Sequence, residues 1–194
     1  MRSNRKLQIQ ILFGLVVFAL IVGLVAWNPR NWQPPRLISN AIRTPLTRPY
    51  GMAPVAFKAF LQACNDTKIH PYRIGQTIGN HPRSVGYHKK DGVLRVGKQS
   101  IDYTTAVDLG ATDLDRTRLN FFLHNLTKNG FACWYREKGK WTGNEHIHAV
   151  YALLPMKPQL KGQVRLFLRE RRARNIRSLR WERRVAKQLR MRRD

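Results

Sequence analysis

Apolar residues recur at intervals of three and four in two segments of the chain, and each segment predicts an amphipathic helix. The first helix is expected over residues 53–66. Its expected buried side carries Val55, Phe57, Phe60, Leu61 and Cys64. The second helix is expected over residues 113–130, where Asp113 or Asp115 can cap the start and Gly130 ends it. Its apolar face carries Leu119, Phe122, Leu123 and Leu126.

Three further segments are rich in β-branched and aromatic residues and predict strands. They are residues 92–110, with a turn at Gly97, and residues 131–137 and 146–154. Residues 78–92 combine Gly, Pro and polar side chains and predict an ordered loop. This mixture of elements predicts a small α+β domain over residues 54–162, with helices packed on an antiparallel sheet.

The N-terminus carries a different pattern. A short basic head, residues 1–8, precedes an uncharged run over residues 9–27 that is long enough to cross the roughly 30 Å hydrocarbon core as one helix. Trp27 and Trp32 would lie near the far interface. We expect an uncleaved, single-pass signal anchor in the inner (cytoplasmic) membrane, with the domain on the periplasmic or extracellular side. A cleaved signal peptide is the alternative.

A proline-rich spacer, residues 28–53, follows the expected anchor, and a basic tail, residues 163–194, follows the domain. The formal net charge of +25 predicts attraction to polyanions. The tail holds much of this charge and has apolar residues along one side, which predicts a basic amphipathic helix. Such a helix suits anionic lipid, an anionic envelope polymer or RNA, whereas a solvated helix that a partner orders is the alternative.

The chain contains two cysteines, Cys64 and Cys133. Neither belongs to a CxxC pair, which excludes a tetrahedral zinc site made of cysteines. Two interpretations stay open at this point. The cysteines are either two buried free thiols or one disulfide, and a disulfide requires a domain outside the cytoplasm.

Residues 143–154, GNEHIHAVYALL, concentrate groups that can do metal chemistry. Glu145 and His148 form an E-x-x-H pair, in which the imidazole can bind a metal and the carboxylate can take a proton from metal-bound water. His146 lies on the same strand face as His148 and is therefore an alternative ligand or a supporting residue. Asp108 ends the apolar run YTTAVDL and is either a ligand or a turn residue.

The segments SVGYHKKDG, YTTAVDLG and EHIHAVY together resemble the zinc D-alanyl-D-alanine carboxypeptidase family, whose metallopeptidase fold is shared with the hedgehog signalling domain. The resemblance covers roughly residues 54–160. It implies a Zn²⁺ ion with Asp108 and His148 as ligands, Glu145 as the catalytic base, and cell-wall peptide bonds as the substrate.

One family motif is displaced in this chain. The family has its first histidine ligand seven residues before the aspartate, where this sequence has Ile101. The nearest upstream candidate is His88, which completes a ligand set of His88, Asp108 and His148 only if the intervening residues form an inserted hairpin. Turn residues at 91–92 and 97 make such a hairpin possible.

Arg83 and its neighbour Ser84 stand where the resemblance implies a substrate-binding site. The family uses an arginine there to hold the terminal carboxylate of the peptide, and a guanidinium fork suits that group. An ordinary surface arginine is the alternative, because the chain has many of them.

These patterns and the resemblance favour a membrane-anchored zinc peptidase that hydrolyses peptidoglycan peptides and is similar to D-Ala-D-Ala carboxypeptidases. A non-catalytic module that binds peptidoglycan or a polyanion on the same scaffold is the first alternative, and the displaced histidine supports it. A membrane-tethered nucleic-acid-binding protein is the second, and it predicts binding that falls steeply with salt. Nucleic acid is the less favoured partner, because the arginines gather in the tail and no aromatic stacking platform is evident.

Overall fold

The computed structural model describes residues 48–79, 86–139 and 145–190. The described residues all belong to one compact unit. The expected anchor, 9–27, and most of the expected spacer therefore lie outside the described residues. Within the described ranges, none of the helices has the length and apolar character needed to cross a membrane.

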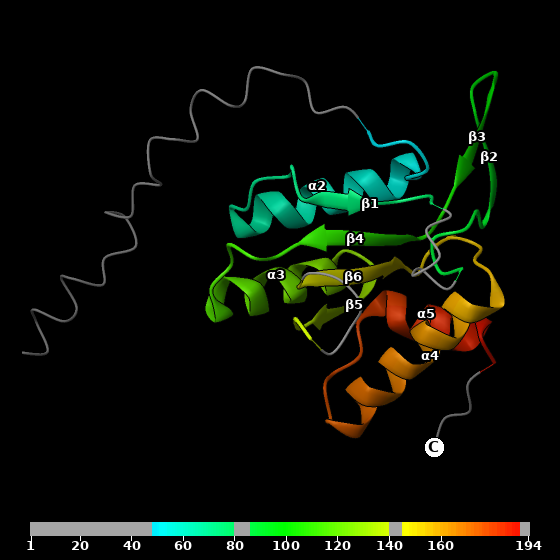
Figure 1. The fold of residues 1–194 in the computed structure, drawn as a ribbon. Helices are drawn as coiled ribbons and strands as arrows, with labels where there is room; N and C mark the ends of the chain where they lie inside the picture. The colour runs from blue at the N-terminus through cyan, green and yellow to red at the C-terminus, as the bar shows by residue number, and fades with distance from the viewer. Residues whose placement is uncertain (1–47, 80–85, 140–144, 191–194) are drawn as a thin grey trace, which may run out of the picture. The chain divides into compact units, whose positions relative to one another are not determined.

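Four strands form an antiparallel sheet in the order β1-β4-β6-β5 (Figure 1). Their bounds are Ile74–Gln76 for β1, Ala106–Gly110 for β4, Phe131–Arg136 for β5 and His146–Tyr151 for β6. Helices cover this sheet, so the prediction of an α+β domain with a small antiparallel sheet is confirmed.

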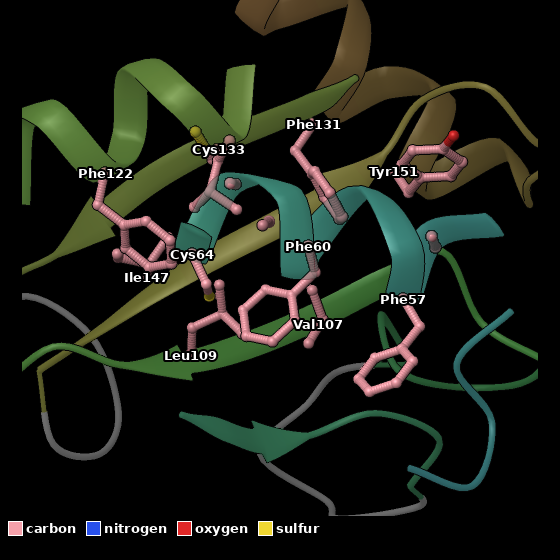
Figure 2. Close-up of a cluster of buried hydrophobic side chains, with 14 of the residues drawn as sticks. Phe57, Phe60, Cys64, Val107, Leu109, Phe122, Phe131, Cys133, Ile147 and Tyr151 are labelled. Carbon is pink, nitrogen blue, oxygen red and sulfur yellow. The ribbon is translucent and has the colours of Figure 1, made fainter. Parts of the chain in front are cut away.

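Helices α2 (Pro54–Thr67) and α3 (Arg116–Lys128) pack on one face of the sheet. Successive residues of a strand point to opposite faces, and on this face β4 and β6 turn only apolar side chains toward the helices. These strand residues are Val107, Leu109, Ile147, Ala149 and Tyr151. Figure 2 shows Phe60 of α2 and Phe122 of α3 meeting them in the core. Both predicted helices are confirmed, and Asp115 is the residue that caps α3, accepting a hydrogen bond from the Arg118 amide at 2.8 Å.

Helices α4 (Pro158–Ala173) and α5 (Arg180–Gln188) pack on the opposite face. The strand residues that meet them are Ala106, Ala132 and Val150. Apolar residues at spacings of four and three give α4 its buried side, namely Leu160, Val164, Phe167 and Leu168. The Trp181 ring nitrogen donates to the Thr127 carbonyl oxygen at 2.7 Å, which ties α5 to the last turn of α3.

This packing corrects the prediction of a separate basic tail over residues 163–194. The expected boundary at 162/163 falls inside α4, and the basic segment forms two helices rather than one. Trp181 and Val185 are buried against the sheet layer, so α5 is part of the same hydrophobic core. The sequence pattern did not indicate this packing of α5, because arginines outnumber the apolar residues of the segment that make the contact.

A hairpin made of β2 (Gly92–Val96) and β3 (Gln99–Tyr103) stands between His88 and β4. Gly97 adopts a positive φ of 60° in its turn. At its base, Asp91 accepts hydrogen bonds from the Thr105 amide at 2.7 Å and the Lys157 amide at 2.9 Å. The inserted hairpin expected from the sequence is thus present, and the buried Asp91 carboxylate fastens its base to the start of α4.

Both cysteines are free and buried, which answers the question that the sequence left open. Burial raises the pKa of the Cys64 thiol and of the Cys133 thiol to about 12. Their role is packing, on the face of the sheet that carries α2 and α3.

Candidate metal centre

Asp108 and His148 stand opposite each other on neighbouring strands. Asp108 of β4 pairs directly with His148 of β6, and both side chains point to the face that carries α4 and α5. His148 Nδ1 lies 2.8 Å from Asp108 Oδ1. The sheet register therefore creates this pair, since a shift by one residue would move both side chains to the apolar face.

His88 reaches the same carboxylate from outside the sheet. It lies in the turn before the β2–β3 hairpin, and its Nε2 is 3.1 Å from Asp108 Oδ2. The chain there is held by a hydrogen bond of 3.0 Å from the Gly79 amide to the His88 carbonyl oxygen. His88, Asp108 and His148 each offer one ligand atom, and these three atoms all lie within 4.8 Å of one another.

Each histidine uses its second ring nitrogen to hydrogen-bond an oxygen behind it. His88 Nδ1 lies 2.9 Å from the Thr77 carbonyl oxygen. His148 Nε2 lies 3.0 Å from Gln163 Oε1, on α4. A carbonyl oxygen only accepts, so a neutral ring places its single proton on that outer nitrogen. The lone pairs of His88 Nε2 and His148 Nδ1 are then both directed at the Asp108 carboxylate.

That arrangement calls for a positive charge between the three groups. Two imidazole lone pairs and a carboxylate repel one another unless a proton or a metal ion lies among them. Histidines that bind metals characteristically donate their other ring N–H to a carbonyl or carboxylate, which fixes the tautomer and the ring orientation. The outer contacts of His88 and His148 match this pattern, so the cluster fits a cation.

Burial and charge keep the ligands in the required forms. The His148 side chain is fully buried and the Asp108 side chain is 19% exposed. Burial lowers the pKa of His148, which favours the neutral, ligating ring. Burial alone would raise the pKa of Asp108, but when the inner nitrogens of His148 and His88 are protonated, their hydrogen bonds and positive charge outweigh burial and hold that pKa far below its usual range.

Aromatic and basic side chains surround the cluster. The Trp134 ring stacks beside the His148 ring, with centroids 6.2 Å apart. The Tyr87 ring meets the same His148 ring edge-on, also at 6.2 Å. His146 Nε2 lies 3.9 Å from Asp108 Oδ1, close enough for a supporting or alternative role but outside hydrogen-bonding distance. Arg136 lies within electrostatic range of Asp108, and burial lowers the pKa of this guanidinium.

Glu145 is placed differently from the other predicted site residues. Its Oε2 accepts a hydrogen bond of 2.9 Å from the Tyr135 hydroxyl, and this bond raises the pKa of Tyr135. Tyr135 packs with the core on the α2/α3 face, the face opposite the cluster. The structure therefore brings together His88, Asp108 and His148, with His146 beside them, whereas Glu145 is engaged elsewhere.

Arg83 and Ser84, the predicted substrate-binding pair, lie outside the described residues. Sequence reasoning missed Thr77 and Gln163, which hold the outer nitrogens of the two histidines. The contact of Thr77 is made by its backbone carbonyl, so its side chain carried no signal. Gln163 did leave a signal, because it is a polar residue inside the apolar stripe of α4.

Comparisons with protein-family models, with curated proteins and with solved structures give no match for this chain. The case for the site therefore depends on its own geometry and on the motifs in the sequence.

Proposed function

We propose that His88, Asp108 and His148 bind a zinc ion and that the protein is a zinc-dependent peptidase acting on cell-wall peptides. The observation that carries the metal site is the pair of buried histidines, each hydrogen-bonded on its outer nitrogen and directed at one carboxylate by its inner nitrogen. Two imidazoles and a carboxylate are ligands that zinc accepts, and three protein ligands leave a fourth position for water.

A zinc ion so held would lower the pKa of its bound water to near 7 and polarise a substrate carbonyl, which is the chemistry of peptide hydrolysis. The chain supplies the rest. Thr77 and Gln163 hold the two rings in the ligating tautomer, and the Trp134 and Tyr87 rings limit water around His148.

Hydrolysis also needs a base, and we propose Glu145 for that role. Its carboxylate must first leave the Tyr135 hydroxyl and turn toward the cluster. Glu145 directly precedes His146 at the start of β6, where the strand ladder imposes fewer constraints than it does further along. The proton from the attacking water would be held on a Glu145 carboxylate oxygen and passed to the leaving amine.

Peptidoglycan peptides are proposed as the substrate because of the motif resemblance described above. The proposed location agrees with this substrate: a single membrane anchor over residues 9–27 would keep the domain at the cell envelope. Arg83 would bind the terminal carboxylate of the peptide. Arg136 is a second cation on the site face, since it pairs with His146 across β5 and β6.

The test uses the full chain in detergent, reconstituted with zinc, and synthetic cell-wall peptides ending in D-Ala-D-Ala. Glu145→Gln should lower the rate of cleavage about 10²–10⁴-fold, the usual contribution of general acid–base catalysis, and leave the zinc content unchanged. Tyr135→Phe should retain activity, because it only releases Glu145. Glu137→Gln, two residues from Tyr135 and exposed, is the matched control. Equal activity in Glu145→Gln and wild type would remove Glu145 from the mechanism.

The engagement of Glu145 by Tyr135 supports a second candidate function, a zinc-stabilised binding module without catalysis. In that case the wild-type chain would contain zinc and bind the peptides without cleaving them. Zinc content and product formation, measured on the same preparation, separate the two candidates.

A further inference from the structure

One pocket of the described residues lies apart from the proposed metal centre. Helices α4 and α5 and the segment that follows β6, residues 152–156, line an open pocket of about 1050 Å³. None of the three metal-binding residues proposed above, nor Gln163, contributes to its lining. Both helices lie on the same side of the sheet, as Figure 1 shows.

The polar lining of this pocket is almost entirely basic. It contains six cationic side chains and no acidic one: Lys161, Arg165, Arg169, Arg172, Arg184 and Arg190. Residues 165, 169 and 172 recur at intervals of four and three, so they form one stripe along α4. Within the part of the chain that the structure describes, Lys161, Arg169 and Arg184 have no acidic side chain within ion-pair distance.

Converging like charges are unfavourable without a counter-charge. In contrast, Arg171 of the same helix points at the buried Glu182 of α5, with Nε and Oε1 2.6 Å apart. The helix pair therefore satisfies one arginine internally and leaves others lining the pocket, where an anion can bind them. Guanidinium groups hold phosphate oxygens through paired N–H donors.

Apart from Gln188, the other lining residues are apolar and not aromatic. They include Leu153, Met156, Val185 and Leu189, and no Phe, Tyr or Trp belongs to the lining. Single-stranded nucleic acids are bound by aromatic side chains on which bases stack, and this pocket offers none. A lining that combines arginines with apolar, non-aromatic side chains instead matches a ligand with an anionic phosphate group and an aliphatic part.

We infer that this pocket binds the headgroup and adjoining acyl region of an anionic phospholipid. The pocket volume of about 1050 Å³ lies just above the usual range for small-molecule sites, roughly 300–1,000 Å³, which leaves room for a headgroup and part of an acyl chain. The same chain carries an uncharged run over residues 9–27, the expected membrane anchor, which would bring the pocket close to lipid. This inference does not depend on the proposed peptidase activity.

The test measures binding of dioctanoyl-phosphatidylglycerol, a soluble short-chain anionic lipid, to the full chain by calorimetry below the micelle concentration. Arg169→Gln with Arg184→Gln should weaken binding about tenfold or more, as expected for the loss of two charge-assisted contacts. Arg177→Gln with Arg180→Gln is the matched control: it removes the same charge from exposed residues outside the pocket, and binding should change less than about twofold.

Three further arms identify the ligand class. Dioctanoyl-phosphatidylcholine and inorganic phosphate should each bind more weakly than the anionic lipid, because one lacks net charge and the other lacks an aliphatic part. EDTA should leave lipid binding unchanged. The inference is overturned if EDTA abolishes binding, if both double variants lose affinity equally, or if an oligonucleotide binds more tightly than the lipid and responds to the pocket variant.

Discussion

On the α2/α3 face of the sheet, β4 and β6 present Val107, Leu109 and Ile147, all almost completely buried. On the other face the same two strands present Asp108 and His148. The difference arises from alternation alone, because adjacent residues of one strand serve the two faces. One face is closed by hydrocarbon packing, while the other buries groups that require hydrogen bonds or a cation to be stable.

This contrast explains how the fold can hold an unfavourable cluster. The apolar face contributes burial energy from Phe60, Phe122 and their neighbours. The polar cluster lies at one part of the opposite face, next to the apolar contacts of α4 and α5. Stability and metal chemistry should therefore respond to different substitutions.

Phe122→Ala should have the largest effect on stability. Phe122 is fully buried on the α2/α3 face, and such truncations usually cost about 3–5 kcal/mol. The metal content of the folded fraction should stay the same. Phe121→Ala is the matched control, because Phe121 is the next residue of α3 and is 53% exposed. Denaturant unfolding measures both variants, and similar losses in the two would break the distinction between the faces.

Asp108→Asn should lower zinc affinity about 100-fold or more, because it removes a charged ligand with almost no change in volume. Asp102→Asn is the control: it removes the partner of Lys90 on the hairpin and should leave zinc binding unchanged. Competition with a chromophoric chelator measures both affinities. Wild-type affinity in Asp108→Asn would contradict the proposed ligand set.

Gln163→Ala should have a smaller effect on the same site. In the proposed site Gln163 would position His148 without binding the metal, and loss of such an outer partner typically costs about 10–100-fold in affinity. Gln159→Ala, also on α4 but exposed, should bind zinc like the wild type. An unchanged affinity in Gln163→Ala would show that α4 does not contribute to the site.

Asp113 is the exposed counterpart of Asp108 and should give the smallest effect. A hydrogen bond from Arg73 lowers the pKa of Asp113, whose side chain is 64% exposed. Because the folded-state pKa of Asp113 is lowered, its pair with Arg73 stabilises the protein at pH values above the unfolded-state pKa of about 3.9. This contribution is lost as the pH falls through the folded-state pKa. Asp113→Asn should therefore cost less than about 1 kcal/mol at neutral pH, and the difference should shrink below about pH 4. Urea unfolding across pH tests this, and a cost that grows at low pH would contradict it.

The sequence predicted the elements whose periodicity is strong. The helices expected over residues 53–66 and 113–130 are present as Pro54–Thr67 and Arg116–Lys128, and the strands around Asp108 and His148 formed where β-branched residues gather. The same approach underestimated α5, because Trp181 and Val185 are isolated among arginines. Their contacts lie across the sheet and leave no local pattern.

The site was predictable only in part, for a similar reason. Asp108 and His148 stood out through their motifs, and the hairpin that returns His88 to them was recognisable from its turn residues. Thr77 acts through a backbone carbonyl that no spacing indicates, whereas Gln163 left only the weak signal of a polar residue in the apolar stripe of α4. Glu145 is the reverse case: its motif predicted a role in the site, but its carboxylate is hydrogen-bonded to the Tyr135 hydroxyl instead.

The most direct test of the central claim is the metal content of the purified full chain, measured by mass spectrometry of the elements after dialysis against trace zinc. We expect about one zinc per chain for the wild type and for His124→Ala, a substitution of an exposed histidine on α3. We expect almost none for His88→Ala, because the His88 ring is buried against Asp108. A wild-type chain without zinc, or a His88→Ala chain that keeps it, would contradict the metal centre.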